Sequence, residues 1–289
     1  MDYLPIVLGL LAALFWGVSD YFAAKPSKEL GPHKTTPYVL FFSAVTILPF
    51  LLYAGINPSI NPFLLLFALF TPFASFLGYF FIYRAFKQGS LSIMAPIVTT
   101  YPIVTVLGAV FILGDKLSQI EIISIAAVIL GIILVSTKFS SFRAKRKLIV
   151  AGVGSAFLST LFIGSPAIFY GAYAAVIGYA FLSFVGRGGG CLLAFASGYL
   201  RKDDLRVPKR KHLLRIAAAG ITDAFAILVF IYAISAQGTA LPIVSALSGF
   251  SGGVTVLLAL ALLRERPEAN QWIGIMVVVI GVVVLSYLS

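Results

Sequence analysis

The sequence predicts an all-α membrane protein with ten transmembrane helices, arranged as two inverted repeats of five helices. Three observations predict this fold class: an apolar composition, ten apolar segments of membrane-spanning length, and a correspondence between the two halves of the chain. Hydrophobic residues make up 60% of the 289 residues and charged residues only 11%, with a mean hydropathy of +1.04. Soluble domains carry roughly a quarter charged residues. A soluble core could not bury this much apolar surface.

Ten segments have the length and composition of a membrane-spanning helix, which needs about twenty apolar residues to cross roughly 30 Å of hydrocarbon. Only helices and closed barrels satisfy every backbone group in lipid, and these segments lack the alternation of barrel strands. The first segment has no basic leader and no cleavage site, so we expect a retained helix rather than a signal peptide. The segments are residues 4–24, 37–53, 63–83, 92–113, 120–137, 148–167, 172–197, 213–235, 240–263 and 272–288.

The second half of the chain corresponds to the first half when it is shifted by about 150 positions, which is the signature of an internal repeat. We therefore divide the chain into a first repeat (residues 1–137), a basic linker (138–147) and a second repeat (148–289). The matching positions are Phe15 and Gly17 with Phe162 and Gly164, Tyr83, Gln88 and Gly89 with Tyr232, Gln237 and Gly238, Thr105 with Thr255, Asp115 with Glu265, and Gly131 with Gly281.

The gaps between the segments indicate how the repeats are oriented. Gaps rich in proline, glycine and asparagine, such as residues 55–62 and 164–171, are expected to form turns. Five crossings in each repeat force the second copy to enter the membrane in the opposite direction. Basic residues collect in the gaps that follow the odd-numbered segments, whereas the opposite face carries only Lys116. The positive-inside rule then predicts a cell-membrane protein with cytoplasmic basic loops and two extracytoplasmic termini.

Several motifs of this chain are found in a known family. They are Phe15-Trp16-Gly17, Ala95-Pro96, Tyr101-Pro102, Gly114-Asp115 and Gly131, with Gln237-Gly238, residues 263–265 and Gly281 in the second half. The sequence resembles the EamA-type members of the drug/metabolite transporter superfamily over essentially its whole length. The resemblance implies two five-helix repeats around a central cavity. Asp115 stands where the family usually has Glu, and Ser248-Gly249 with Gly252-Gly253 stand where a second proline is expected.

Two charged residues lie near the middle of apolar segments, where an unpaired charge is costly and is rarely kept without a function. Arg187 follows Gly186 in the seventh segment, and Asp223 lies in the eighth. Because segments joined by one loop usually pack together, we expect these two side chains to pair. They could merely lock two helices together. Alternatively, Arg187 could bind the carboxylate or phosphate of a solute, with Asp223 as its resting partner or as a proton carrier.

Further candidates for the cavity wall lie on the first, third and fourth segments. Asp20 follows Trp16 by four residues and shares its helical face, although a local salt bridge to Lys25 or Arg84 is the alternative. Tyrosines can offer aromatic and hydroxyl contacts to a solute, but most of the thirteen tyrosines must serve packing or the membrane interface. The tyrosines that we include in the predicted substrate site are Tyr79, Tyr83 and Tyr101.

Helix-breaking residues occur in corresponding segments of the two repeats. Paired interruptions of this kind are the best sequence indication of a central site in an inverted-repeat transporter. Proline removes a hydrogen-bond donor from a helix, and glycine loosens it. The predicted gating or hinge residues are Pro96 and Pro102 in the fourth segment and Gly249, Gly252 and Gly253 in the ninth.

The function that these features favour is secondary active transport of a small polar or amphipathic metabolite by alternating access. Amino acids, sugars, nucleotide precursors and amphipathic drugs all suit such a cavity, and protons are the candidate coupling ion. A channel or a lipid-flipping protein is the alternative. An intramembrane enzyme is disfavoured, because the only histidines, His33 and His212, lie outside the predicted segments and no metal, phosphate-loop or nucleophile motif is present.

The remaining partners follow from composition. We expect the lipid bilayer as the surroundings, no cofactor and no metal. The net charge of +11 does not indicate a nucleic-acid partner, since the basic residues lie in short gaps between apolar segments. The single cysteine, Cys191, allows no disulfide within the chain. Small residues in the fifth and tenth segments permit helix contacts, so a monomer and a homodimer are both compatible with the sequence.

Overall fold

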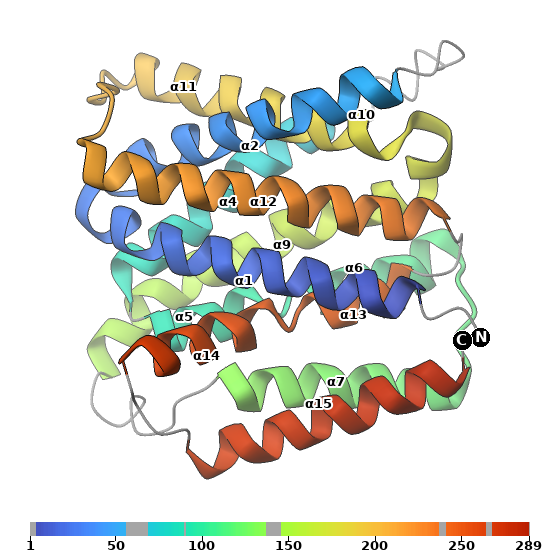
Figure 1. Ribbon diagram of the computed structural model, residues 1–289. Coiled ribbons are helices and arrows are strands. Elements are labelled where there is room, and N and C mark those ends of the chain that lie inside the picture. Colours follow the sequence, from blue (N-terminus) through green and yellow to red (C-terminus); the bar gives the residue numbers. More distant parts are fainter. Residues whose placement is uncertain are drawn as a thin grey trace.

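The fold is a bundle of helices that run side by side along a common direction (Figure 1). The computed structural model describes residues 4–55, 69–89, 91–136, 146–236, 241–263 and 268–288. Within these ranges the elements are helices joined by turns and short loops, and no strand occurs. The predicted all-helical class is therefore confirmed.

The helices of the first half occupy residues 4–136. They are α1 (Leu4–Leu30), α2 (Pro32–Ala54), α4 (Phe70–Gln88), α5 (Leu91–Val98), α6 (Tyr101–Gly108), the π-helical turn η1 (Ala109–Leu113) and α7 (Gln119–Ser136). Helix α7 begins at a capping box, in which the Ser118 hydroxyl accepts from the Glu121 amide at 3.2 Å and Glu121 accepts from the Ser118 amide at 2.7 Å.

The helices of the second half follow the same order. They are α9 (Arg146–Ile177), α10 (Tyr179–Phe184), the π-helical turn η2 (Val185–Gly189), α11 (Gly190–Leu200), α12 (Arg210–Ala236), α13 (Leu241–Ser248), α14 (Ser251–Leu263) and α15 (Ala269–Leu288). Helices α1 and α9, the first of each half, start at opposite ends of the bundle, and α15 ends on the side where α1 starts (Figure 1).

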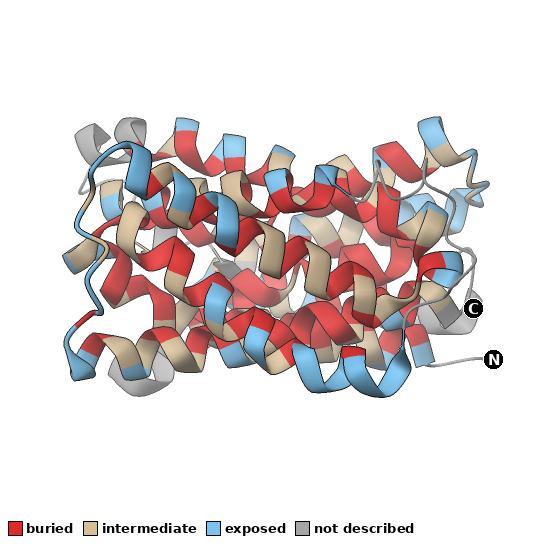
Figure 2. Cartoon of the chain, turned by 90° about the horizontal axis from the view of Figure 1, so that it is seen from above, coloured by how far each residue is buried: buried red, intermediate tan, exposed pale blue. Residues whose placement is uncertain are grey.

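Six helical stretches of the described chain are long and apolar enough to cross a membrane, and three shorter apolar helices of 10–17 residues accompany them. Large apolar side chains cover the outside of the bundle; Phe111, for example, is 80% exposed and Ile280 is 64% exposed. Buried residues fill the middle of the bundle instead (Figure 2). This distribution suits surroundings of lipid. The count of ten membrane crossings stays a prediction.

Two predicted turns are placed differently in the structure. The range 164–171 was expected to be a turn, but it lies inside α9, which continues to Ile177. The helix contains Pro166, and such a proline is tolerated when neighbouring helices support it. The chain turns at Gly178 instead, where φ is +97°. Similarly, α1 continues to Leu30, and Gly31 at φ +83° leads directly into α2, so the basic gap after the first segment is helical rather than a loop.

Matching contacts in the two halves confirm the internal repeat. The hydroxyl of Thr105 donates to the carbonyl oxygen of Gly164 at 3.2 Å, and its counterpart Thr255 donates to the carbonyl oxygen of Gly17 at 3.1 Å. At the edge of the bundle, Gly131 of α7 lies against Val278 of α15, while Gly281 of α15 lies against Val128 of α7. The small residues of these two helices thus serve a contact within the chain.

The fourth and ninth predicted segments are interrupted, as their prolines and glycines indicated. Thr99 and Thr100 separate α5 from α6, which places Pro102 in the first turn of α6. In the second half, the break falls at Gly249 and Phe250. A Cβ atom on Gly249 would lie 2.7 Å from Cγ of Pro102, so the two interruptions contact each other.

Of the five predicted hinge residues, Gly249 lies within an interruption, and Pro102 lies in the first turn after one. Pro96 lies within α5, three residues before its break. Gly252 and Gly253 belong to the first turn of α14. Glycine keeps its backbone N–H and weakens a helix only through its conformational freedom, so it can occupy a first turn without breaking the helix. A gating or hinge role for Pro96, Pro102, Gly249, Gly252 and Gly253 stays a prediction.

The close helix contacts at the two corresponding glycines give the first prediction. An added Cβ would lie 2.8 Å from the carbonyl oxygen of Ser251 at Gly17, and 2.8 Å from that of Tyr101 at Gly164. Gly17→Ala and Gly164→Ala should each destabilise the protein by about 1–3 kcal/mol, because the backbones must move apart. Thermal unfolding in detergent measures the effect. Gly154→Ala is the control, since nothing lies within 4 Å of its added Cβ; equal behaviour of all three variants would contradict the packing argument.

Candidate functional site

A buried ion pair joins the two charged residues that the sequence places in apolar segments. Nε of Arg187 donates to Oδ2 of Asp223 at 2.7 Å, and Nη2 donates to Oδ1 at 3.0 Å. Arg187 is 4% exposed and Asp223 is fully buried. Two parallel N–H donors that meet both oxygens of one carboxylate form the strongest geometry of this kind. The predicted pairing is present.

Three further side chains donate to Asp223. The indole Nε1 of Trp16 donates to Oδ1 at 3.0 Å, the hydroxyl of Ser43 donates to Oδ2 at 2.7 Å, and the hydroxyl of Tyr79 donates to Oδ1. An ionised carboxylate only accepts hydrogen bonds, and both oxygens of Asp223 receive hydrogen bonds from donors. The surroundings of Asp223 therefore stabilise its charged form.

Arg187 is held by neutral groups as well. Its Nη1 donates to the Ser75 hydroxyl at 3.3 Å and Nη2 donates to the Tyr79 hydroxyl at 2.9 Å, while the guanidinium carbon lies 4.8 Å from the centre of the Tyr79 ring. The Tyr79 hydroxyl thus accepts from Arg187 and donates to Asp223. Cation–π contacts of this type gain strength away from water. Tyr79 bridges the two charged groups.

The backbone around Arg187 is a π-helical turn, η2, rather than an unwound segment. Such turns are rare and occur frequently at functional sites. A Cβ on Gly186 would lie 3.3 Å from the hydroxyl oxygens of both Ser75 and Tyr170, and one on Gly190 would lie 3.2 Å from the carbonyl of Pro72. Glycine at these positions lets η2 and α11 approach α4 closely, which carries the guanidinium into the centre of the bundle.

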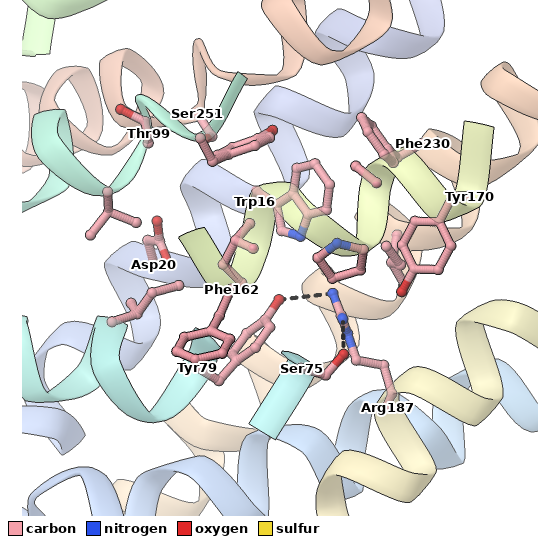
Figure 3. A pocket seen from close by; sticks show the side chains of 17 residues that line it. Trp16, Asp20, Ser75, Tyr79, Thr99, Phe162, Tyr170, Arg187, Phe230 and Ser251 are labelled. Atoms are coloured by element: carbon pink, nitrogen blue, oxygen red, sulfur yellow. Dashed lines mark hydrogen bonds between the residues drawn. The ribbon is translucent and has the colours of Figure 1, made fainter. Parts of the chain in front are cut away.

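A small cavity adjoins the ion pair, with a volume of about 50 Å³. Since one water molecule needs roughly 10–15 Å³ of such volume, the cavity can hold a few waters but no metabolite. Figure 3 shows that Arg187 reaches it from one side and Asp20 lies toward the other. Its walls come from both repeats and consist of Trp16, Asp20, Ser75, Tyr79, Ile82, Val98, Thr99, Tyr101, Phe162, Ile163, Pro166, Ala167, Tyr170, Arg187, Ile227, Phe230 and Ser251.

Asp20 lies in the wall of this cavity instead of in a local salt bridge. It makes no hydrogen bond or ion pair with any other residue that the structure describes. Lys25, the neighbour proposed to neutralise it, forms an ion pair with Glu29 at 3.7 Å. Asp20 is therefore a carboxyl group that faces the cavity without a partner in the described chain.

The predicted tyrosines take different positions. Tyr79 and Tyr101 line the cavity, and the Tyr101 hydroxyl lies 2.6 Å from the hydroxyl of Ser248. Tyr83 is fully buried behind the wall, where its ring packs edge-to-face against that of Tyr79. Its hydroxyl has no hydrogen-bond partner among the described residues. The structure thus brings Trp16, Asp20, Tyr79, Tyr101 and Arg187 to one cavity and leaves Tyr83 outside it.

Several residues of the site were not predicted from the sequence. Phe162, Tyr170 and Phe230 supply aromatic walls, and Ser43 and Ser75 supply hydroxyl groups to the ion pair. Serine and phenylalanine are ordinary components of apolar helices, so composition does not single them out. Of these residues, only Phe162 could have been identified from the sequence, because the internal repeat aligns it with Phe15, next to Trp16.

Side chains at one end of the bundle link the two halves of the chain. Lys34 of α2 pairs with Asp204 at 2.7 Å, His33 lies 3.3 Å from Asp203, and His212 of α12 lies 3.2 Å from Glu29. The hydrogen bond from Lys34, together with one from the Arg206 amide, holds the pKa of Asp204 below its usual range. The loop that follows α11 is therefore attached to the start of α2 at this end.

Comparison with known proteins assigns the family. The model of the EamA-like transporter family matches residues 4–137 and again residues 150–287. The chain belongs to the EamA-like transporter family. The two matches also show two EamA repeats, as the residue correspondences predict. EamA-like proteins are transporters, which fits the expectation that this chain is not an enzyme.

Two individual proteins are similar to this EamA-like transporter. An uncharacterised protein of Methanocaldococcus jannaschii is 32% identical over 132 residues, which are 45% of this chain and 95% of that protein. A protein of known crystal structure aligns over 100% of this chain and 98% of its own, with a TM-score of 0.79 at 16% sequence identity. The second comparison shows that the two proteins share a fold.

The ion pair gives the second prediction. Removal of one partner from a buried pair costs about 3–5 kcal/mol, because the other charge stays behind without compensation. Arg187→Gln and Asp223→Asn should each lower the unfolding temperature of this EamA-like transporter in detergent strongly. The double variant should lower the unfolding temperature by less than the sum of the two single decreases. The control Lys34→Gln breaks an ion pair with an exposed aspartate and should change the unfolding temperature little. Additive losses in the double variant would contradict a coupled pair.

Proposed function

We propose that this protein is a secondary active transporter that moves a small polar or amphipathic metabolite across the cell membrane by alternating access. The observation that carries the proposal is the buried ion pair of Arg187 with Asp223, in which Arg187 lines a cavity whose walls come from both EamA repeats. Membership of a transporter family supports transport as the function. The ion pair supports the cavity as the place where the solute binds.

The ion pair favours recognition of an anionic group. A charged arginine inside a membrane is costly and commonly marks the path of a substrate or ion. The guanidinium presents a planar fork that fits a carboxylate or phosphate. In this structure, the carboxylate of Asp223 accepts the hydrogen bonds from Arg187 that the anionic group of a solute could accept. We propose that the solute competes with Asp223 for Arg187.

The interrupted helices support alternating access. The breaks between α5 and α6 and between α13 and α14 contact each other, and Thr99 and Ser251 beside them line the cavity. Discontinuous helices at the interface of inverted repeats are the usual place of transporter sites, and the repeats rock around them. We propose ten membrane crossings in two inverted repeats, with the basic end in the cytoplasm and both termini outside. In this arrangement, the Lys34–Asp204 ion pair would lie at the cytoplasmic end.

A channel or lipid-flipping protein is the alternative, and no specific contact favours it. A cavity of about 50 Å³ does not form a continuous path. Counterflow in proteoliposomes separates the two functions, because a transporter exchanges labelled solute for unlabelled solute with saturation. Conductance without saturation would support a channel.

The role of Arg187 gives the third prediction. Arg187→Gln removes the cationic fork, so transport of anionic solutes into proteoliposomes should fall at least tenfold, while neutral solutes should be affected much less. Tenfold corresponds to about 1.4 kcal/mol, which lies below the usual energy of a charge-assisted hydrogen bond. A panel of labelled amino acids, sugars and nucleotide precursors measures this selectivity.

The control for this experiment is Arg201→Gln, because Arg201 is 59% exposed and lies away from the cavity. This variant should transport every solute like the wild type. Equal loss for anionic and neutral solutes in Arg187→Gln would instead indicate that the ion pair has a structural role only.

A further inference from the structure

The charges of the cavity do not balance. Three charged groups belong to its wall or touch its arginine: Arg187, Asp223 and Asp20. Arg187 and Asp223 neutralise each other through two hydrogen bonds. An ionised Asp20 would therefore leave one uncompensated negative charge at membrane depth, which costs several kcal/mol. Asp20 needs either a proton or a cation.

The groups that face Asp20 offer no cation. Asp223 of α12 acts on it as a like charge, and the neutral hydroxyl groups of Tyr83 and Tyr101 lie near it. Thr99 and Ser251, at the helix breaks, share the cavity wall with it (Figure 3). The cation of the cavity, Arg187, is engaged by Asp223, Ser75 and Tyr79. Among the residues that the structure describes, no cation therefore compensates Asp20.

We propose that Asp20 is a cation-exchange site of the cavity. It holds a proton while the cavity is closed and empty, and it exchanges that proton for a cationic group of the transported solute. In this step, the O–H bond of the Asp20 carboxyl group breaks, its proton passes to water on the open side, and the carboxylate forms an ion pair with the solute's ammonium group. The inference rests on the proposed transport function. It adds that the transported solute carries a cationic group at one end.

The size of the cavity agrees with the proton-bound state. About 50 Å³ accommodates a protonated carboxyl group and a few waters, but no organic cation. Asp223 is unsuited to the same role, because its five hydrogen bonds from Arg187, Trp16, Ser43 and Tyr79 stabilise the carboxylate. The proposal therefore assigns the change of charge to Asp20 and not to Asp223.

Aromatic rings beside Asp20 suit an organic cation. Trp16 lies one helical turn before it, and the ring of Tyr101 packs edge-to-face on Trp16 with centroids 6.1 Å apart. Both side chains line the cavity. Aromatic faces attract ammonium groups, and tryptophan does so best. A substituted ammonium ion could thus contact both the Asp20 carboxylate and aromatic rings at this end of the cavity.

Trp16 also provides the measurement. The chain has two tryptophans, and Trp272 lies on the outside of the bundle at 54% exposure. In a Trp272→Phe background, Trp16 fluorescence of the detergent-purified protein should titrate as one group across about pH 4 to 10. Asp20→Asn should abolish this titration. Asp115→Asn, which alters a carboxyl group outside the cavity wall, should keep it. The absence of a titration in the parent, or its persistence in Asp20→Asn, would overturn the proposal.

Competition by a cation tests the exchange step. Choline is the probe and 3,3-dimethyl-1-butanol, its neutral analogue of equal shape, is the control. A tenfold excess of choline over its dissociation constant should lower the titration midpoint by about one pH unit, because choline binds only the deprotonated site. The alcohol should leave the midpoint unchanged. A midpoint that does not respond to choline, or that responds equally to both, would overturn the exchange.

These measurements separate the inference from the proposed function. Both use purified protein in detergent and need no transport. An intact titration with no saturable counterflow in proteoliposomes would contradict the transporter proposal and leave the Asp20 site in place. Counterflow without a titration that depends on Asp20 would contradict the Asp20 site and leave the transporter proposal in place.

Discussion

The negative charge of Asp223 is the constraint on which the centre of this bundle depends. A carboxylate at zero exposure inside a membrane needs donors at both oxygens. These donors come from α1, α2, α4 and η2 in the form of Trp16, Ser43, Tyr79 and Arg187. Together with α12, which carries Asp223, five elements are thereby held at fixed positions around one side chain. The cavity lies beside this cluster because the same side chains form part of its wall.

The scaffold is symmetric, but the site is not. Thr105 and Thr255 make equivalent hydrogen bonds, and the glycines of α7 and α15 make equivalent contacts. The alignment of Tyr83 with Tyr232, however, places Ala74 opposite Asp223. The repeat therefore explains how the helices pack and why a cavity lies between the halves. Arg187 and Asp223 belong to the second repeat and Asp20 to the first, so the charged groups of the site do not follow the symmetry of the frame.

The sequence predicts the frame and the charged pair well, and the neutral half of the site poorly. Apolar length and the matching residues suffice to predict the helices and the repeat. Arg187 and Asp223 stand out because a charge in an apolar segment is costly and is rarely kept without a function. The bridging position of Tyr79 among thirteen tyrosines depends on the helix packing, which local sequence does not contain. The expected turn at 164–171 failed for the same reason: Pro166 and its glycines suit a turn, but neighbouring helices support a continuous α9.

The ion pair also constrains how the two halves can move. Arg187 and Asp223 both belong to the second repeat, so rocking of the repeats as units leaves their pair intact. The proposed rocking would separate Asp223 from Trp16, Ser43 and Tyr79, which belong to the first repeat. Hydrogen bonds to a charged group contribute about 1.5–3 kcal/mol each. Neutral donors of the first repeat thus connect it to the ion pair of the second repeat at Asp223.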